Sequence, residues 1–518
     1  MLSTLYSAGL SGIDGFIVSV ECDSRKSIPA FEIVGLPDAA VKEAKERVRT
    51  ACGNCGVAFP DLAHVINLAP ADRRKEGSAF DMAILLGILR NAGLVKKVDM
   101  SDKCFVGELS LSGDLRPIRG ALCMCCAAKD AGLAEIFVPA GNAMEAAAVE
   151  GIRVYPVKSM NELINHLNGV APIEPASDPE ARLADRSVYP LDFSDVKGQQ
   201  YAKRAMEIAA AGGHNILLIG PPGTGKSMLA KRLPGILPPL TFDEAIETTK
   251  IHSVAGNLGE NVSIVNVRPF RAPHHTMSAV SLVGGGINPL PGEISLSHNG
   301  VLFLDELPEF PKQVTDSLRQ PLEDKKVTIT RANGRVTFPC SFMLVSAMNP
   351  CRCGYYGHST LRCTCKPGDV KRYMSRISGP LLDRIDIQVE LPSLSYEEIS
   401  SQNESAERSP SIRERVVKAR RFALDRIAKD SPAGDGQNVF CNSQMDSAMI
   451  RKYCRLDDNA SALLKNAFET MGLSARGYDR ILRVARTIAD LDESETITAV
   501  HVAEAIQYRK LDKKYDFK

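Results

Sequence analysis

The chain contains 518 residues, which predicts two to four domains at roughly 150 residues per domain. Its 63 Lys and Arg residues balance 62 Asp and Glu residues, which excludes a histone-like basic protein and an acidic disordered tail. No apolar run reaches the roughly 18 residues of a membrane-spanning helix, and no Lys or Arg precedes Arg25, so we expect a cytoplasmic protein with no membrane partner whose 14 cysteines are thiols or metal ligands.

Residues 1–168 predict a first domain of mixed α/β character. Short strands are expected at residues 17–20 and 31–34, and residues 39–52 have the spacing of an amphipathic helix. The range 169–190 is rich in Pro, Ala and Asp and has no apolar periodicity. It is therefore predicted to be an exposed and mobile linker.

Residues 191–400 predict an α/β core. The apolar segments 216–219, 301–304 and 342–346 alternate with helical stretches, and strands this apolar are usually buried on both faces of a parallel sheet. After a polar loop, the range 411–518 has a helical pattern and is predicted to form a separate helical domain.

The strongest motif follows the first of these strands. It fits G-x-x-x-x-G-K-[ST] in the strand–loop–helix context that the motif requires. The backbone N–H groups of the loop and of the helix N-terminus are expected to bind the phosphates of ATP. Lys226 is expected to reach the β- and γ-phosphates, and Ser227 to ligate Mg²⁺. The predicted nucleotide-binding residues are Gly220, Pro221, Pro222, Gly223, Thr224, Gly225, Lys226 and Ser227.

Two acidic residues end the strand at 301–304. Asp305 is expected to hold the Mg²⁺ ion, and Glu306 to polarise the attacking water, which would make the protein a hydrolase. An apolar run that ends in Asp-Glu is common by itself, but together with the nucleotide motif it favours a catalytic interpretation.

Residues 327–338 predict a β-hairpin, because alternating strands flank the turn signal Asn333-Gly334. The hairpin carries Arg331 and Arg335, and Lys325 and Lys326 precede it. Four cations there could follow the phosphate backbone of DNA. A solvated edge hairpin would carry the same residues, so charge alone leaves both interpretations open.

The loop 351–365 contains two C-x-C pairs separated by nine residues: Cys351, Cys353, Cys363 and Cys365. Four thiolates in one short loop can form a tetrahedral structural Zn²⁺ site. His358 is a possible substitute ligand, and free or redox-active thiols are the alternative.

Several longer strings carry a family resemblance over nearly the whole chain. They are Asp195-Val-Lys-Gly-Gln199, Phe270-Arg-Ala-Pro-His-His275, Gly284-Gly-Gly286, Pro291-Gly-Glu-Ile-Ser295 and His298-Asn-Gly-Val-Leu-Phe-Leu-Asp-Glu306. With them the chain resembles the magnesium-chelatase-like AAA+ ATPases, and within that group the ComM/YifB-type branch. In related motors the hairpin points into a ring pore, and the stretch at Gly284–Gly286 looks like a second pore element.

The resemblance implies roles for three more residues. Asn349 is in the sensor-1 position, where its amide would help to orient the attacking water. Arg384 is similar to the arginine finger that completes the site of a neighbouring subunit, and Arg476 resembles the sensor-2 arginine. A finger that acts in trans implies a homo-oligomeric ring, expected to be a hexamer.

The first domain resembles the Lon-protease proteolytic fold through the strings at 35–43, 74–78 and 107–113. A serine–lysine protease needs a hydroxyl beside a lysine base. The chain reads Arg119-Gly-Ala-Leu122 where the family has its lysine, and the serine position falls on Ala79. Ser78 lies one position away, so a shifted pair stays open. We expect a non-proteolytic module that binds DNA or a partner.

The expected architecture is therefore an N-terminal Lon-protease-like α+β domain, an AAA+ P-loop parallel-sheet core with an inserted hairpin and cysteine loop, and a C-terminal helical lid. The expected function is an ATP- and Mg²⁺-dependent ring motor with structural Zn²⁺ that acts on single-stranded or branched DNA. The resemblance implies branch migration or helicase activity in natural transformation and recombination. The alternatives are the ATPase subunit of a magnesium chelatase, a protein-remodelling ATPase and an ATP-dependent protease, and the missing dyad disfavours the protease.

Overall fold

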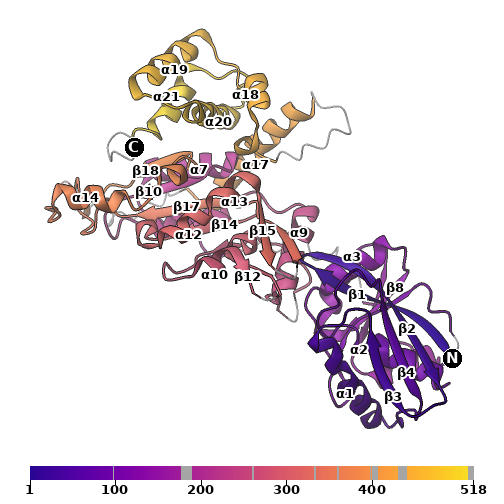
Figure 1. Cartoon of the computed structure of the whole chain (residues 1–518). Coiled ribbons are helices and arrows are strands. Elements are labelled where there is room, and N and C mark those ends of the chain that lie inside the picture. Colours follow the sequence, from indigo (N-terminus) through magenta and orange to yellow (C-terminus); the bar gives the residue numbers. More distant parts are fainter. Residues whose placement is uncertain are drawn as a thin grey trace.

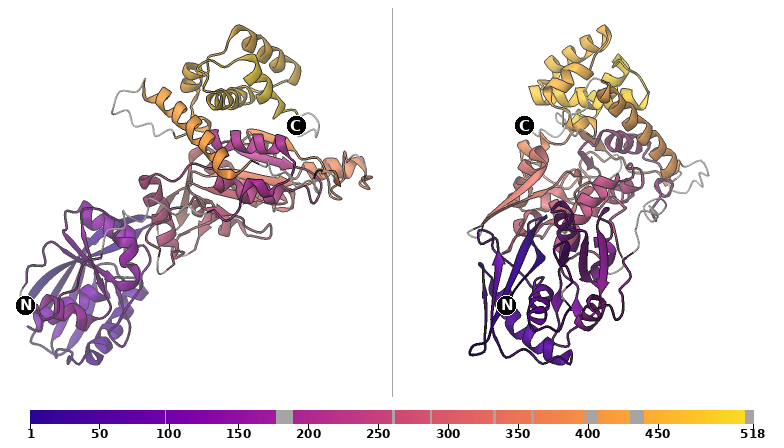
Figure 2. Two further views of the ribbon diagram at one scale, coloured as in Figure 1. Left: turned by 180° about the vertical axis from the view of Figure 1, so that it is seen from behind. Right: turned by 90° about the vertical axis from the view of Figure 1, so that its right-hand side faces the viewer.

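The computed structural model describes residues 1–96, 98–176, 189–259, 262–286, 288–331, 334–358, 361–396, 398, 407–429 and 440–511. Figure 1 shows three regions in a row, with the N-terminal region at one end, a sheet-containing core in the middle and C-terminal helices at the other end. Two further views in Figure 2 show the same arrangement. The structure confirms the α/β fold class with a parallel-sheet core.

The N-terminal region is built on a mixed sheet with the strand order β3-β4-β2-β1-β5-β8-β9. Its strands are β1 (Leu2–Ser11), β2 (Asp14–Arg25), β3 (Ala30–Val34), β4 (Ala63–Ala69), β5 (Lys103–Phe105), β8 (Glu135–Pro139) and β9 (Arg153–Val157). Apolar residues alternate along β2, as expected of a strand that turns one face to a core. Both predicted strands and the predicted helix of this region are present.

Helices cover both faces of this sheet and create two hydrophobic clusters. One cluster includes side chains from α1 (Ala39–Asn54), α2 (Asp81–Asn91) and α5 (Met160–Leu167). The other includes side chains from α3 (Ala121–Asp130) and α4 (Ala143–Ala146). A short ribbon of β6 (Glu108–Leu109) and β7 (Leu115–Arg116) lies beside the sheet as a separate pair.

The first residues of the range predicted as a linker are attached to this region. The side chain of Ile173 is buried, and its N–H donates to Nδ1 of His166 over 2.8 Å. The N–H of Ala176 donates to the carbonyl of Val154 over 2.8 Å. Apolar burial therefore extends the N-terminal unit to Ala176, while the predicted linker from 177 to 188 lies outside the described residues.

The core sheet is parallel with the order β11-β14-β17-β10-β18. Its strands are β10 (Ile216–Ile219), β11 (Phe270–Arg271), β14 (Val301–Leu304), β17 (Met343–Met348) and β18 (Ile387–Glu390). Every residue of the three central strands is buried, as the apolar sequence predicted. Because the strands are parallel, their carboxyl ends meet at one edge of the sheet.

Helices pack around this sheet and two small elements extend from it. The helices that matter below are α7 (Gln200–Gly212), α8 (Lys226–Arg232), α9 (Phe242–Ala255), α12 (Lys312–Ser317), α13 (Arg319–Asp324), α14 (Pro367–Met374) and α15 (Gly379–Leu382). Between α10 (Ala279–Val283) and α11 (Glu293–Leu296), the chain forms a ribbon of β12 (Gly284–Gly285) and β13 (Leu290–Pro291). A second hairpin pairs β15 (Lys326–Arg331) with β16 (Gly334–Pro339).

The C-terminal region is helical, as its sequence predicted. It contains α17 (Ser409–Ala428), α18 (Ser447–Tyr453), α19 (Asp458–Met471), α20 (Ala475–Leu491) and α21 (Ala499–Gln507). These helices share one hydrophobic cluster with α7 and with one face of the core sheet. Most of the polar loop that precedes residue 411, residues 401–410, lies outside the described residues. None of the helices that the structure describes has the length and apolar character needed to cross a lipid bilayer.

The N-terminal region contacts the core at two places. The N–H of Gly120 donates to the carbonyl of Ser253 on α9, whose hydroxyl donates to the buried Glu145 carboxylate over 2.5 Å. At the second place, the turn between β1 and β2 reaches the β15–β16 hairpin, where a β-carbon at Gly12 would lie 2.6 Å from the side chain of Val336. The N-terminal region is therefore packed against the core in this structure.

Candidate functional site

The predicted phosphate-binding loop, residues 220–225, lies directly between β10 and α8 at the carboxyl edge of the core sheet. Gly223 and Gly225 have φ values of +80° and +89°, a left-handed backbone that favours glycine. Helix α8 begins at Lys226, so its N-terminal N–H groups face the loop. This is the arrangement in which loop amides and a helix N-terminus bind phosphate groups.

Lys226 is buried inside the loop. Its ammonium donates to the carbonyl oxygens of Gly220 over 2.7 Å and Pro221 over 2.8 Å. It also donates to Oδ1 of Asn349 over 3.2 Å. Burial lowers the pKa of Lys226 to about 8, although the nearby carboxylates of Asp305 and Glu306 act in the opposite direction. Lys226 and Asn349, which was predicted to be in the sensor-1 position, are 123 positions apart in the sequence and meet in one site.

Ser227 and Asp305 are also brought together. The Ser227 hydroxyl donates to Oδ2 of Asp305 over 2.7 Å. Asp305 follows β14 and Asn349 follows β17, so both residues reach the site because their strands end at the same edge. A hydroxyl and a carboxylate are oxygen ligands of the kind that Mg²⁺ prefers, and these two residues fit the predicted ion.

Glu306 lies at the margin of the group formed by Lys226, Asn349, Ser227 and Asp305. Its backbone is left-handed with a φ of +52°, and about half of its side chain is exposed. Oε2 of Glu306 lies 3.4 Å from Nδ1 of His275, whose ring packs beside His274. No role was predicted for His275 from the sequence. The sequence pointed to His275 only through its place in the shared string at 270–275. Its contact with Glu306 was not predictable, because the two residues lie in segments that are far apart in the sequence.

Arg384 lies at the opposite edge of the same sheet. The side-chain amide of Asn215 donates to the carbonyl of Arg384 over 2.8 Å, and Asn215 comes directly before β10. The phosphate-binding loop comes directly after β10, so the two edges are separated by the length of a four-residue strand, roughly 13 Å. The Arg384 guanidinium pairs with Glu323 over 2.6 Å. Arg384 is thus placed away from the nucleotide loop of its own subunit.

Arg476 belongs to the same edge as Arg384. It is exposed in the first turn of α20, one helical turn before the buried Arg480. Side chains four residues apart lie on one face of a helix, and Arg480 faces Asp383 and Asp386, each over 3.8 Å. Those two acids flank Arg384 in the sequence. The sequence left open to which subunit's nucleotide Arg476 belongs, and this position places it on the same side as Arg384.

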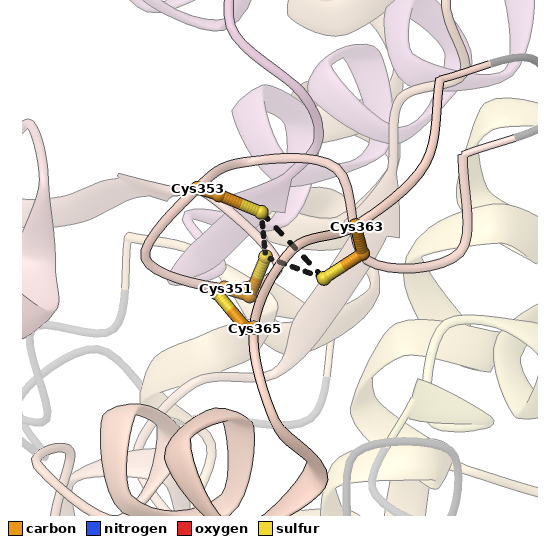
Figure 3. A group of neighbouring side chains, drawn as sticks. All are labelled: Cys351, Cys353, Cys363 and Cys365. Atoms are coloured by element: carbon orange, nitrogen blue, oxygen red, sulfur yellow. Dashed lines mark hydrogen bonds between the residues drawn. The ribbon is translucent and has the colours of Figure 1, made fainter.

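The four cysteines of the loop 351–365 converge (Figure 3). Their sulfur atoms all lie within 4.8 Å of one another, and those of Cys351, Cys353 and Cys363 are separated by 3.3 to 3.7 Å. Four thiolates at about 2.3 Å from one Zn²⁺ ion would have sulfur atoms roughly 3.8 Å apart, so this donor set fits a single tetrahedral ion. All 14 cysteines are free, as expected, and this cluster is a potential metal site.

His358 is not the substitute ligand that the sequence analysis allowed. Its Nδ1 accepts from the N–H of Leu361 over 2.9 Å, and its Nε2 lies 2.6 Å from the hydroxyl of Ser393. Both ring nitrogens are therefore engaged by groups outside the cysteine cluster. The imidazole attaches the loop to a neighbouring segment.

The predicted hairpin is present, but its four cations do not lie together. Lys326 pairs with Pro339 at the base and Arg331 pairs with Gly334 at the tip, so they are separated by roughly 16 Å along β15. Lys325 also lies at the base, where the N–H of Cys340 donates to its carbonyl. The turn residue Asn333 lies outside the described residues.

The exposed arginines at the tip, Arg331 and Arg335, lie beside the glycine-rich ribbon of β12 and β13. A β-carbon at Gly285 would lie 3.2 Å from Nη2 of Arg331, and one at Gly284 would lie 2.9 Å from Ile329. The two elements that the family resemblance suggested as pore elements are therefore neighbours. Together they present an exposed positive tip.

Ala79 stands at the serine position of the Lon-like pair, and Leu122 ends the stretch Arg119-Gly-Ala-Leu122 that stands where the family has its lysine. Ala79 and Leu122 are both buried in the hydrophobic cluster beneath α3 and α4. The Ser78 hydroxyl donates to the carboxylate of Glu108, which also pairs with Arg116. Among the described residues, the Ser78 side chain makes no hydrogen bond with a lysine. The shifted dyad that the sequence left open is not formed in this structure.

Comparison with known proteins covers most of the chain. Residues 20–142 match the family model described as subunit ChlI of Mg-chelatase, residues 192–399 match magnesium chelatase, subunit ChlI, and residues 406–509 match its C-terminal model. The chain is 41% identical over 512 residues to competence protein ComM of Haemophilus influenzae, which covers 98% of both proteins. It is 40% identical over 513 residues to YifB of Escherichia coli, an uncharacterized protein, covering 99% of this chain and 98% of that protein.

Proposed function

Because the chain belongs to the magnesium chelatase subunit ChlI family and to its ComM/YifB-type branch, we propose that it is an ATP-hydrolysing ring motor that acts on DNA. In this proposal Lys226 binds the β- and γ-phosphates, and Ser227 and Asp305 hold Mg²⁺. Glu306 polarises the attacking water, which Asn349 helps to orient. The hydrogen bonds that connect Lys226 with Asn349 and Ser227 with Asp305 support these roles.

The ring is supported by the placement of the arginines. Arg384 lies at the edge of the sheet opposite to its own phosphate-binding loop, so it can act only on a nucleotide presented by another subunit. In a closed homo-oligomer, such as a hexamer, each loop edge meets the arginine edge of its neighbour. Arg384 then stabilises charge on the transferred phosphoryl group, and Arg476 contributes from the same side.

The observation that carries the DNA proposal is the exposed hairpin tip with Arg331 and Arg335 beside the glycine-rich ribbon. Two exposed guanidinium groups can contact successive phosphates of a single strand or a branched junction. Lys325 and Lys326 at the hairpin base would extend the same positive path. The proposed outcome of hydrolysis is branch migration or unwinding during recombination of transforming DNA.

The test compares ATP hydrolysis with and without single-stranded, duplex and branched DNA. Replacing Arg331 and Arg335 by Ala should leave basal hydrolysis near the wild-type rate, because the hairpin tip is remote from Lys226. DNA binding should weaken about tenfold or more, and the slope of log affinity against log salt should fall by roughly 1 to 2, because fewer counterions are released. Movement of branched DNA should decrease further than binding.

The matched control replaces Arg421 and Arg451, two exposed arginines on α17 and α18, and should keep both DNA binding and its salt dependence. It removes the same net charge from the C-terminal helices. Wild-type protein that neither binds DNA nor is stimulated by it would contradict the proposal. That result would favour an ATPase that acts on a protein partner, as a chelatase subunit does.

We also infer that the cysteine cluster binds one structural Zn²⁺ ion per chain. The support is the sulfur spacing, which suits a tetrahedral ion with four thiolate ligands. Elemental analysis of folded protein purified under reducing conditions should give about one zinc per chain, and replacing Cys351 and Cys353 by Ser should remove it. A zinc content near zero in the wild-type protein would favour free thiols.

A further inference from the structure

The cysteine loop begins inside the nucleotide site. Asn349, whose side-chain oxygen accepts from Lys226, is only two residues before Cys351. Cys351 is fully buried, whereas most of the other described residues of the loop are partly or fully exposed. A loop with so little apolar burial has few internal contacts to fix its shape, so a metal cross-link would supply that order. The position of Asn349 is therefore expected to depend on whether the cysteine cluster holds a metal ion.

The loop also touches the phosphate-binding loop directly. A β-carbon at Gly354 would lie 2.6 Å from Cδ and 2.8 Å from Cγ of Pro222, distances shorter than normal van der Waals contact. The Gly354 backbone is left-handed with a φ of +87°, and its N–H donates to the carbonyl of Cys351 over 3.0 Å. A tight turn that begins at the first cysteine therefore presses its glycine against Pro222.

A third attachment joins the cysteine loop to the phosphate-binding loop through the segment 391–393. His358 holds the loop to Ser393, and the carbonyl of Leu391 lies close to Gly220, where a β-carbon would meet it at 2.7 Å. The side-chain amide of Gln199 donates to the carbonyl of Pro392 over 2.8 Å and to that of Thr224 over 3.3 Å. The segment 391–393 is thus attached both to the cysteine loop and to the phosphate-binding loop.

We propose that Zn²⁺ in the cysteine cluster turns this loop into a rigid brace that holds Pro222 and Asn349 in the arrangement that binds nucleotide, so that nucleotide affinity depends on the zinc. The inference rests on the proposed zinc and ATP sites. Without the ion, the four cysteine side chains are no longer held together and the loop loses its cross-link. The contact between Gly354 and Pro222 then loosens, and the phosphate-binding loop samples other conformations. The zinc positions the site and does not touch the nucleotide.

The decisive experiment compares Gly354→Ala with Gly357→Ala. Both glycines lie in the same loop and have left-handed backbones, with φ values of +87° and +76°. A β-carbon at Gly354 meets Pro222, whereas at Gly357 it has no heavy atom within 4 Å. Neither change touches a thiol. The pair therefore separates the contact with the phosphate-binding loop from the strain of placing alanine at a left-handed position.

For each variant, zinc per chain is measured by elemental analysis, and the affinity for a fluorescent, non-hydrolysable ATP analogue is measured by titration. Gly354→Ala should retain one zinc and bind the analogue about tenfold more weakly, whereas Gly357→Ala should retain both zinc and affinity. In the wild-type protein, removing zinc with a chelator should weaken binding by at least as much, and adding zinc back should restore it. Cys353→Ser should lose the zinc and the affinity together.

Each failure has a distinct meaning. A Gly354→Ala variant with unchanged affinity, or an equal loss in Gly357→Ala, would overturn the brace and leave the zinc site standing. Zinc-free protein with full affinity would overturn the brace as well. Wild-type protein that contains no zinc would overturn the metal site and the brace together. Wild-type protein that holds zinc but binds no nucleotide would instead contradict the proposed ATP site.

Discussion

The N-terminal region and the ATPase core each resemble a catalytic fold, and they differ in what surrounds the positions where catalysis takes place. In the core, polar side chains from segments far apart in the sequence are connected by hydrogen bonds, as between Lys226 at the start of α8 and Asn349 after β17. In the N-terminal region, Ala79 occupies the serine position and Leu122 belongs to the stretch that stands where the family has its lysine; both are buried in a hydrophobic cluster.

The difference lies in the side chains at the two sites and not in the fold that carries them. Burying alanine and leucine stabilises the N-terminal region, whereas a buried lysine without a partner would destabilise it. The core cannot make the same exchange, because its ligand is charged and needs charged and polar groups around it. Function must therefore be read from the side chains at the site rather than from the fold.

The largest effect is expected from Lys226→Ala. It removes the only cation that the structure places inside residues 220–225, and the phosphates lose a charged hydrogen bond. Nucleotide affinity should fall at least about a hundredfold, which a fluorescent-nucleotide titration would show as loss of binding. Lys231→Ala, an exposed position on the same helix, is the control and should bind normally. A Lys226 variant with wild-type nucleotide affinity would contradict the role of this lysine in binding the phosphates.

Glu306→Gln should separate binding from hydrolysis. The amide keeps the size of the side chain and removes the base, so nucleotide affinity should stay normal while turnover falls about 10² to 10⁴-fold. Glu309→Gln is the matched control, because Glu309 is a nearby exposed acid that pairs with Arg376. Steady-state hydrolysis and nucleotide titration on both variants make the test. Normal hydrolysis by the Glu306 variant would show that this role is wrong.

Arg384→Ala should bind ATP normally and hydrolyse it about 10² to 10³-fold more slowly. Mixing it with Glu306→Gln should restore part of the activity, because some interfaces in a mixed ring combine an intact Glu306 with an intact Arg384. Arg376→Ala controls for the loss of charge, because Arg376 is another partly exposed arginine that lies shortly before Arg384 in the sequence. If subunits exchange and no activity returns, the finger does not act in trans.

Arg476→Ala should reduce hydrolysis less, and mixtures of variants identify the nucleotide on which it acts. If Arg476 acts with Arg384 on the neighbouring subunit, mixing its variant with Glu306→Gln restores activity. Mixing it with Arg384→Ala does not, because every interface then lacks one arginine. If Arg476 serves its own subunit, the two results are exchanged. Hydrolysis rates of the two mixtures at equal ring concentration distinguish these cases.

The nucleotide loop was predictable because its parts are contiguous: the strand, the glycines, Lys226 and Ser227 occupy a single segment. Asp305 and Asn349 could be added because parallel strands end at one edge. The contacts of His275 with Glu306 and of Gly354 with Pro222 could not be predicted, since each joins segments that only the packing of the sheet and loops brings together. The separation of Lys326 from Arg331 required the strand register. The Lon-like resemblance indicated the N-terminal fold but not the apolar filling of its site.

The smallest effect is expected from Ser78→Ala, which tests the N-terminal side of the comparison. The Ser78 hydroxyl donates to Glu108, and that carboxylate keeps its ion pair with Arg116 when the hydroxyl is removed. The free energy of unfolding should therefore fall by only about 1 kcal/mol, and ATP hydrolysis should not change. Wild-type protein and variant should both fail to cleave an unfolded protein substrate in the presence of ATP. A serine nucleophile needs a base such as lysine, whereas the Ser78 hydroxyl is hydrogen-bonded to a carboxylate. ATP-dependent proteolysis by the wild-type chain that disappears in Ser78→Ala would show that the N-terminal region has kept its chemistry after all, with a dyad that assembles only in the working ring. Without such proteolysis, the contrast between the two regions stands.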